Sequence, residues 1–133
     1  MTSPNVWTIF DQLRQRDPGS LSNDERLVLA FGEVRTEVNN GGLDSYLRYG
    51  YGQNAAVAVV AARIADCPAL ASLIEDAIAL VGPDVLDYHD DEGLYQRLEQ
   101  IEDGLQDLDQ RFYELEHTAD LDTAQCRLLA RLT

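Results

Sequence analysis

The segment from Glu37 to Asn54 reads EVNNGGLDSYLRYGYGQN and interrupts the apolar-periodic sequence on either side of it. We call it the turn segment. Glycine adopts positive φ without a steric penalty and asparagine tolerates it better than most residues, so Asn40-Gly41-Gly42 can end one helix and turn the chain sharply. We therefore expect positive φ at Gly41 or Gly42. Beyond the turn, four residues recur at spacings of three and four and predict helical turns that rest on a core: Leu43, Tyr46, Leu47 and Gly50.

Apolar residues on both sides of the turn segment recur at helical spacing. Ahead of it, the pattern predicts a helix from about Pro4 to Arg16, a turn over residues 17–20, and a helix over Asn23–Asn39 that starts with a capping box formed by Ser22 and Glu25. After it, residues 55–65 are apolar nearly all round and should form a helix enclosed by its neighbours. Pro68 suits the first turn of the next helix, which should end at Gly82-Pro83.

The last third of the chain contains the clearest amphipathic pattern. A polar connector over residues 87–92 precedes apolar residues at alternating spacings of four and three: Leu94, Leu98, Ile101, Leu105, Leu108, Phe112 and Leu115. This seam predicts one long amphipathic helix packed against the helices over 23–39 and 68–81. A short helix from Thr123, capped by Leu121-Asp122, should follow. Because no run alternates at period two, we predict an all-α fold in a single domain, residues 1–133, with residues 1–21 as an N-terminal helix and turn.

The chain carries 24 acidic residues against ten basic ones, all of them arginine. The acidic residues are concentrated in one region of the sequence. Residues 84–122 contain 14 of them and only two arginines. Such a chain should be repelled by nucleic acid and by anionic membranes, so a partner recognised by charge would be basic. The 45% hydrophobic content indicates a folded protein. No basic region precedes an apolar run at the N-terminus, so we expect no signal peptide and a cytoplasmic location.

Two segments resemble the DNA-mimic protein family, whose members are small acidic all-α domains. The first contains Glu37, Asn40-Gly41-Gly42-Leu43, Tyr46 and Gly52. The second, from Leu105 to Tyr113, reads LQDLDQRFY and is similar to the family's Leu-Asp-x-Arg-Phe-Tyr run. Leu43 and Leu47 stand where the family usually has phenylalanine, and Ser45 stands where it has glutamine. The resemblance spans roughly residues 22–132 and implies a non-enzymatic protein that imitates the phosphate backbone of DNA.

Seven acidic residues of the predicted long helix avoid its apolar seam: Glu99, Glu102, Asp103, Asp107, Asp109, Glu114 and Glu116. Acids three or four residues apart on a helix are separated by about 5–6 Å along its axis. The charges of one B-DNA strand recur at a comparable order of spacing, about 3.4 Å of axis. Together with the resemblance, this row predicts binding to the arginines of a basic DNA-binding protein, such as a transcription factor or a nucleoid protein. A merely solvated outer face is the alternative.

Other functions remain open at this point. The same acids would suit an antitoxin or immunity protein that inhibits a basic nuclease. A small-molecule-binding or enzymatic domain could instead be built around Tyr46, Tyr49 and Tyr51, although we expect these rings to pack in the core. Neither His89 nor His117 has a neighbouring Ser or Cys pattern for nucleophilic catalysis, so we expect no catalytic residues. His117 suits the negative end of the long helix dipole.

The spacing of Asp87, His89 and Asp91 is similar to the start of a calcium loop, but its sixth and twelfth positions hold Glu92 and Leu98 instead of Gly and Glu. A weak surface cation site is the alternative that the spacing leaves open. The two cysteines, Cys67 and Cys126, are isolated and lack zinc-ligand spacing, so we expect thiols. We therefore predict no metal site and no cofactor, and either a monomer or a homodimer.

Overall fold

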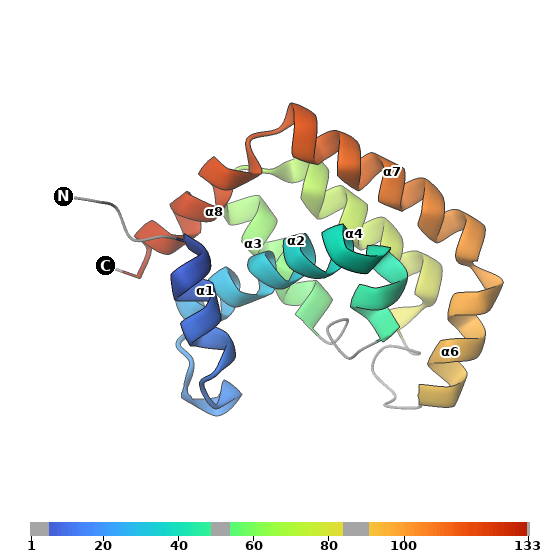
Figure 1. The fold of residues 1–133 in the computed structure, drawn as a ribbon, viewed down its shortest axis with the longest axis horizontal. Coiled ribbons are helices and arrows are strands. Elements are labelled where there is room, and N and C mark those ends of the chain that lie inside the picture. The colour runs from blue at the N-terminus through green and yellow to red at the C-terminus, as the bar shows by residue number, and fades with distance from the viewer. Residues whose placement is uncertain (1–5, 49–53, 84–90, 133) are drawn as a thin grey trace.

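The computed structural model describes residues 6–48, 54–83 and 91–132. Within these ranges the chain forms seven α-helices and one 3-10 helix and contains no β-strand, which confirms the predicted all-α fold (Figure 1). None of the helices in these ranges is both long and apolar enough to cross a membrane. Gly50 of the helical spacing after the turn lies outside the described residues, as do Tyr49, Tyr51 and Gly52. The same holds for Asp87 and His89 of the spacing that is similar to a calcium loop.

The N-terminal part consists of α1 (Val6–Arg14), a 3-10 turn (Pro18–Ser20) and α2 (Asn23–Arg48). The predicted capping box starts α2. The Glu25 backbone N–H donates to Ser22 Oγ at 3.1 Å, and the Ser22 backbone N–H donates to Glu25 Oε1 at 2.8 Å. Two backbone donors at the helix start are thus satisfied locally, which explains why this boundary could be predicted.

Gly42 bends α2 sharply. Helical geometry extends past the predicted end at Asn39 and is interrupted at Gly42, where φ is 79° and ψ is 179°. The prediction of positive φ in the turn segment is therefore confirmed at Gly42, while Gly41 has no positive φ. The helix resumes over residues 43–48, where Leu43, Tyr46 and Leu47 are all buried. The turn thus places one and a half helical turns on the core, as their spacing predicted.

Helices α3 (Ala55–Ile64) and α4 (Pro68–Val81) pack against each other, and α3 also packs on α2. The bounds of α4 confirm the prediction, with Pro68 in its first turn and Gly82 at its end with a φ of 97°. The expectation that α3 is enclosed on all sides is wrong. Val60 and Ile64 are 48% and 41% exposed, because the neighbouring helices cover only the opposite side of α3.

The predicted long helix forms two helices, α6 (Asp91–Gln100) and α7 (Glu102–Thr118), which follow one edge of the molecule in Figure 1. They are separated at Ile101, where φ is −108° and ψ is 15°. The apolar seam continues across this break, with Leu98, Leu105, Leu108 and Phe112 buried. Both helices contact α2 and α4, as predicted. The predicted register of the seam is therefore confirmed. The break at Ile101 could not be predicted, because the apolar spacing continues across it.

The last helix, α8 (Leu121–Ala130), lies beside α1, α2 and α3. It begins two residues earlier than predicted, and its cap is Asp120 instead of Leu121-Asp122. The Thr123 backbone N–H donates to Asp120 Oδ1 at 2.9 Å. Asp122 is then available for a different contact, an ion pair with α2.

Candidate functional site

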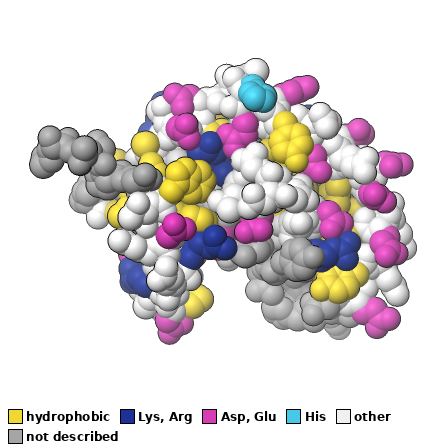
Figure 2. Space-filling view, in the orientation of Figure 1, with side chains coloured by type: hydrophobic (Ala, Val, Ile, Leu, Met, Phe, Trp, Pro, Cys, Tyr) yellow, Lys and Arg dark blue, Asp and Glu magenta, His cyan; other side chains and the backbone are white. Residues whose placement is uncertain are grey.

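Five of the seven acidic residues predicted to bind a partner are exposed on α6 and α7. We call these five the acidic face: Glu99, Glu102, Asp103, Asp107 and Glu114. In the sequence they alternate with the buried residues of the seam. On the helices they lie on the exposed side, away from the contacts with α2 and α4. Figure 2 shows acidic side chains spread along the edge of the molecule where Figure 1 draws α7 and α6. The exposed part of the predicted row therefore forms a surface that a partner can reach.

The other two acids of the row, Asp109 and Glu116, are half-buried and face inward. Asp109 Oδ1 accepts a hydrogen bond from the backbone N–H of Leu43 at 2.8 Å. Burial raises the pKa of the Asp109 carboxyl, and the hydrogen bond from Leu43 opposes this shift. Glu116 forms an ion pair with Arg35 on α2 at 2.8 Å. These two carboxylates hold α7 to α2, so their positions suit a structural role.

Charge pairing distinguishes the acidic face from eight acidic residues elsewhere in the described part of the chain. No residue of the acidic face forms an ion pair within the ranges that the structure describes. Elsewhere seven of the ten arginines pair with acids, as Arg14–Glu37, Arg16–Glu25, Arg35–Glu116, Arg35–Asp122, Arg48–Asp44, Arg63–Glu75, Arg111–Asp76 and Arg131–Asp24. Among the described residues, no ion pair compensates the negative charge of the acidic face.

The acidic face is long enough to span several phosphates of one DNA strand. Glu99 and Glu114 are separated by 15 residues, and helical rise places them about 22 Å apart along the path of α6 and α7. The break at Ile101 bends this path. A B-DNA strand presents about six phosphates over that length. The face can thus meet several cationic side chains of one partner at the same time.

The turn segment contacts the second segment on which the resemblance is based. A Cβ atom added at Gly42 would lie 2.7 Å from Asp109 Oδ2, and the Tyr113 hydroxyl donates to the Val38 carbonyl at 3.3 Å. Glu37 lies near Arg14 on α1. The side of the turn with Asn40 and Gly41 is exposed, and Tyr46 is buried. Gly42 and Val38 therefore lie at the joint between α2 and α7, whereas Glu37 contacts α1 and Asn40 and Gly41 face solvent.

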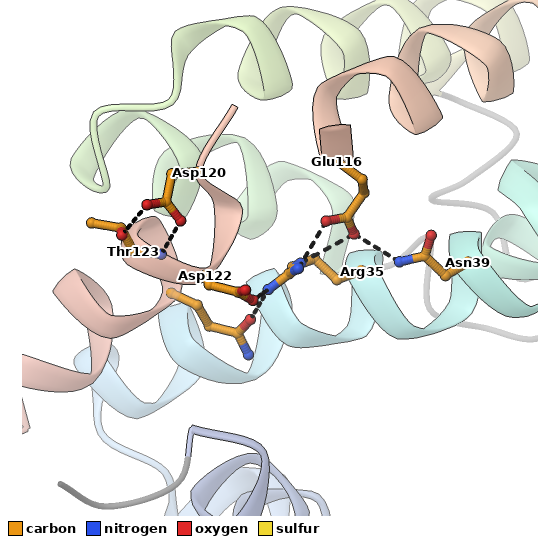
Figure 3. Close-up of polar contacts among 7 residues, drawn as sticks. Arg35, Asn39, Glu116, Asp120, Asp122 and Thr123 are labelled. Atoms are coloured by element: carbon orange, nitrogen blue, oxygen red, sulfur yellow. Dashed lines mark hydrogen bonds and ion pairs between the residues drawn. The ribbon is translucent and has the colours of Figure 1, made fainter. Parts of the chain in front are cut away.

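Arg35 on α2 contacts residues of three other helices, a role that the sequence analysis missed. Its guanidinium donates to Glu116 Oε1 at 2.8 Å, to Asp122 Oδ1 at 2.8 Å and to Gln125 Oε1 at 2.7 Å (Figure 3). It also lies over the Trp7 ring, 5.5 Å from the ring centre. Burial would lower the pKa of Arg35, but its hydrogen bonds to Glu116 and Asp122 raise it above the ordinary value. One side chain thus joins α1, α2, α7 and α8. The signal was available, since Arg35 lies four residues after Phe31 beside the apolar stripe of α2.

Glu33 is the second polar residue that the sequence analysis missed. Its side chain is buried on α2, and Oε2 accepts a hydrogen bond from Asn54 Nδ2 at 3.2 Å. Burial raises the pKa of the Glu33 carboxyl. Burial and the nearby charge of Glu33 also raise the pKa of the Tyr46 hydroxyl. Tyr46 is thus held as a neutral phenol in the core, which agrees with the packing role expected for it.

No group of three or more His, Cys, Asp or Glu side chains is placed to hold a metal ion in the described residues. Cys67 is buried, Cys126 is exposed, and both are free thiols. Burial raises the pKa of the Cys67 thiol, which makes it a poor nucleophile at neutral pH. His117 lies exposed in the last turn of α7, where its position was predicted.

The fold and the surface together define an all-α domain with an unpaired acidic face. A family model described as DMP19-like protein matches residues 19–131. The chain belongs to the DMP19-like protein family, because this match covers most of its length and both segments quoted for the resemblance. Searches of curated proteins and of solved structures returned no significant match.

Proposed function

We propose that the protein is a DNA mimic that binds a basic DNA-binding protein through the acidic face. The partner would be a transcription factor or a nucleoid protein whose DNA-binding surface carries arginine and lysine side chains. The acidic face would occupy the positions that phosphates take on that surface. No chemistry on a substrate is involved in this proposal.

The observation that carries the proposal is the absence of ion pairs at the acidic face in the described residues, beside arginines that pair with acids elsewhere. Clustered like charges repel one another and destabilise a folded domain. A partner with clustered arginines would relieve this repulsion when it binds. Membership of the DMP19-like family and the net charge of −14 support the same function.

Electrostatic complementarity mainly accelerates association and suppresses wrong partners. Exposed charges are screened beyond a Debye length of about 8–10 Å at physiological ionic strength. Binding through the acidic face should therefore weaken steeply as salt is added. It should also compete with DNA, because both ligands would need the same cations of the partner.

The test begins with a pulldown at low salt, elution with salt and identification of the retained protein. Its DNA binding is then measured with increasing amounts of the parent or of a neutralised variant. That variant carries Glu99→Gln, Asp103→Asn, Asp107→Asn and Glu114→Gln, which are all exposed. Asp109 and Glu116 stay unchanged, because their carboxylates hold α2 against α7.

A variant matched in net charge removes four charges away from α6 and α7 and carries Asp11→Asn, Asp24→Asn, Asp66→Asn and Glu75→Gln, of which Asp24 and Glu75 form exposed ion pairs with Arg131 and Arg63. We expect the neutralised variant to associate about tenfold more slowly or worse and to lose competition with DNA. The matched variant should stay close to the parent. Equal losses in both variants would show that only net charge matters, and the proposed surface would be wrong. A retained nuclease, inhibited by the parent, would instead favour the immunity function.

A further inference from the structure

A cleft of about 490 Å³ lies in the N-terminal part of the fold. It is bounded by the end of α1, the turn over residues 16–21, the first half of α2 and the start of α3. None of the described residues that line it belongs to α6 or α7. Its volume lies within the range of sites for small molecules, about 300–1,000 Å³. The cleft is therefore a candidate site independent of the proposed partner surface.

Three residues of α2 line the cleft at spacings of three and four: Arg26, Leu29 and Glu33. This spacing places them in a row on one side of the helix. From Arg26 to Glu33 the helix rises about 10 Å. The row therefore presents a cation, an apolar side chain and a carboxyl group in that order along the cleft.

Glu33 forms the buried end of this row. Only 6% of the surface of Glu33 is exposed. A carboxylate can accept hydrogen bonds at about four positions. Asn54, which also lines the cleft, supplies one donor at 3.2 Å. Arg14 contributes a favourable charge nearby, but its guanidinium also lies 3.7 Å from Glu37. A cationic group of a ligand in the cleft would add a hydrogen-bond donor to this carboxyl group.

Arg26 forms the open end of the row. Its side chain is exposed, and the structure records no ion pair or hydrogen bond for its guanidinium with another described residue. Arg16, which lines the same end, forms an ion pair with Glu25 and donates to the Ser20 carbonyl at 2.9 Å. Arg26 is thus the guanidinium that remains available to an anionic group.

We propose that this cleft binds a small zwitterionic molecule in which an apolar chain separates a cationic group from a carboxylate. The cationic group would meet Glu33 and Asn54, the apolar chain would lie over Leu29, and the carboxylate would meet Arg26. A molecule with only one of the two charges would leave one end of the row without a partner. Recognition of both ends together is the property that separates this site from a general anion-binding surface.

The probe is 6-aminohexanoate, which has an ammonium group and a carboxylate at the two ends of a methylene chain. Hexanoate and hexylamine are the matched probes, since each lacks one charged group. Binding is followed by the amide chemical shifts of the isotope-labelled full chain through the millimolar range. We expect saturable shifts around the cleft, with each single-charge probe binding at least about tenfold more weakly, a difference of ~1.4 kcal/mol.

Two variants assign the ends of the probe. The Arg26→Gln variant should bind 6-aminohexanoate no better than hexylamine, and the Glu33→Gln variant should bind it no better than hexanoate. Arg97→Gln is the control, because Arg97 is an exposed arginine on α6 away from the cleft. No saturable shift with 6-aminohexanoate, or unchanged binding to Arg26→Gln, would overturn the proposal. Should Glu33→Gln fail to fold, the exposed Arg26→Gln variant and the three probes still decide the question.

Discussion

The backbone N–H of Leu43 donates a hydrogen bond to Oδ1 of Asp109 across 2.8 Å, and this contact joins positions 66 residues apart in the chain. Leu43 follows Gly42, where the helical backbone is interrupted, so its N–H is one of the donors that a helix start leaves unpaired. The Asp109 carboxylate supplies the missing acceptor from α7. A cap of this kind, contributed by a distant helix, fixes the short helix over residues 43–48 against α7.

Removal of this acceptor should destabilise the protein. We expect Asp109→Ala to lower the free energy of unfolding by about 1 kcal/mol, as for the loss of a helix cap. Asp109→Asn, which keeps an acceptor oxygen, should lose less. The measurement is urea denaturation at neutral pH, with Asp107→Ala on the exposed acidic face as the control. Equal losses for Asp109→Ala and Asp107→Ala would contradict a capping role.

Gly42 should resist substitution for two physical reasons. Its φ of 79° is unfavourable for residues with a side chain, and an added Cβ would lie 2.7 Å from Asp109 Oδ2. We expect Gly42→Ala to lower the free energy of unfolding by more than about 1 kcal/mol. Gly19→Ala is the control, because its Cβ would have 3.9 Å to the nearest atom. Similar unfolding midpoints for the two variants would show that the turn does not need glycine at position 42.

Loss of Arg35 should be the most costly of these changes. Arg35→Ala would leave Glu116 without its ion-pair partner in a half-buried position and would remove the contact with Trp7. We expect a loss of about 3 kcal/mol, the lower end for breaking a buried pair. Arg97→Ala should change stability by less than about 0.5 kcal/mol, as is usual for exposed positions. A comparison of thermal or urea unfolding of the two variants tests this difference, and a small effect of Arg35→Ala would show that its contacts with α1, α7 and α8 do not stabilise the fold.

Glu33 should make stability depend on pH. Burial raises the pKa of its carboxyl in the folded state above the ordinary value of 4.5. At pH values between the unfolded and the folded pKa, Glu33 is protonated in the folded protein and ionised in the unfolded chain. The stabilisation that comes from this tighter proton binding is present at low pH and is lost as pH rises through the folded pKa. The raised pKa of Asp109 acts in the same direction.

We therefore expect Glu33→Gln to gain stability relative to the parent as pH rises from about 4 to about 7. The measurement is the difference in free energy of unfolding between the two proteins at several pH values. Glu99→Gln, on the acidic face, controls for the removal of one carboxyl group. A difference between Glu33→Gln and the parent that stays constant over this range would mean that burial does not shift the titration of Glu33.

Local patterns in the sequence determined most of the helices. The capping box at Ser22, the bounds of α4 and the turn at Gly42 depend on residues within about one helical turn of each other, so they could be predicted without the fold. The apolar seam of α6 and α7 also had the predicted register, because helical periodicity decides which side chains share one face.

Only the tertiary structure decided which polar side chains face inward. Asp109 and Glu116 have the same local sequence character as the acids of the acidic face, and their contacts lie with Leu43 and Arg35 on another helix. The exposure of α3 likewise depends on how many helices pack around it. A charged group is buried or left in water according to the partner that the fold brings to it, and that partner lies 66 residues away for Asp109 and 81 for Glu116.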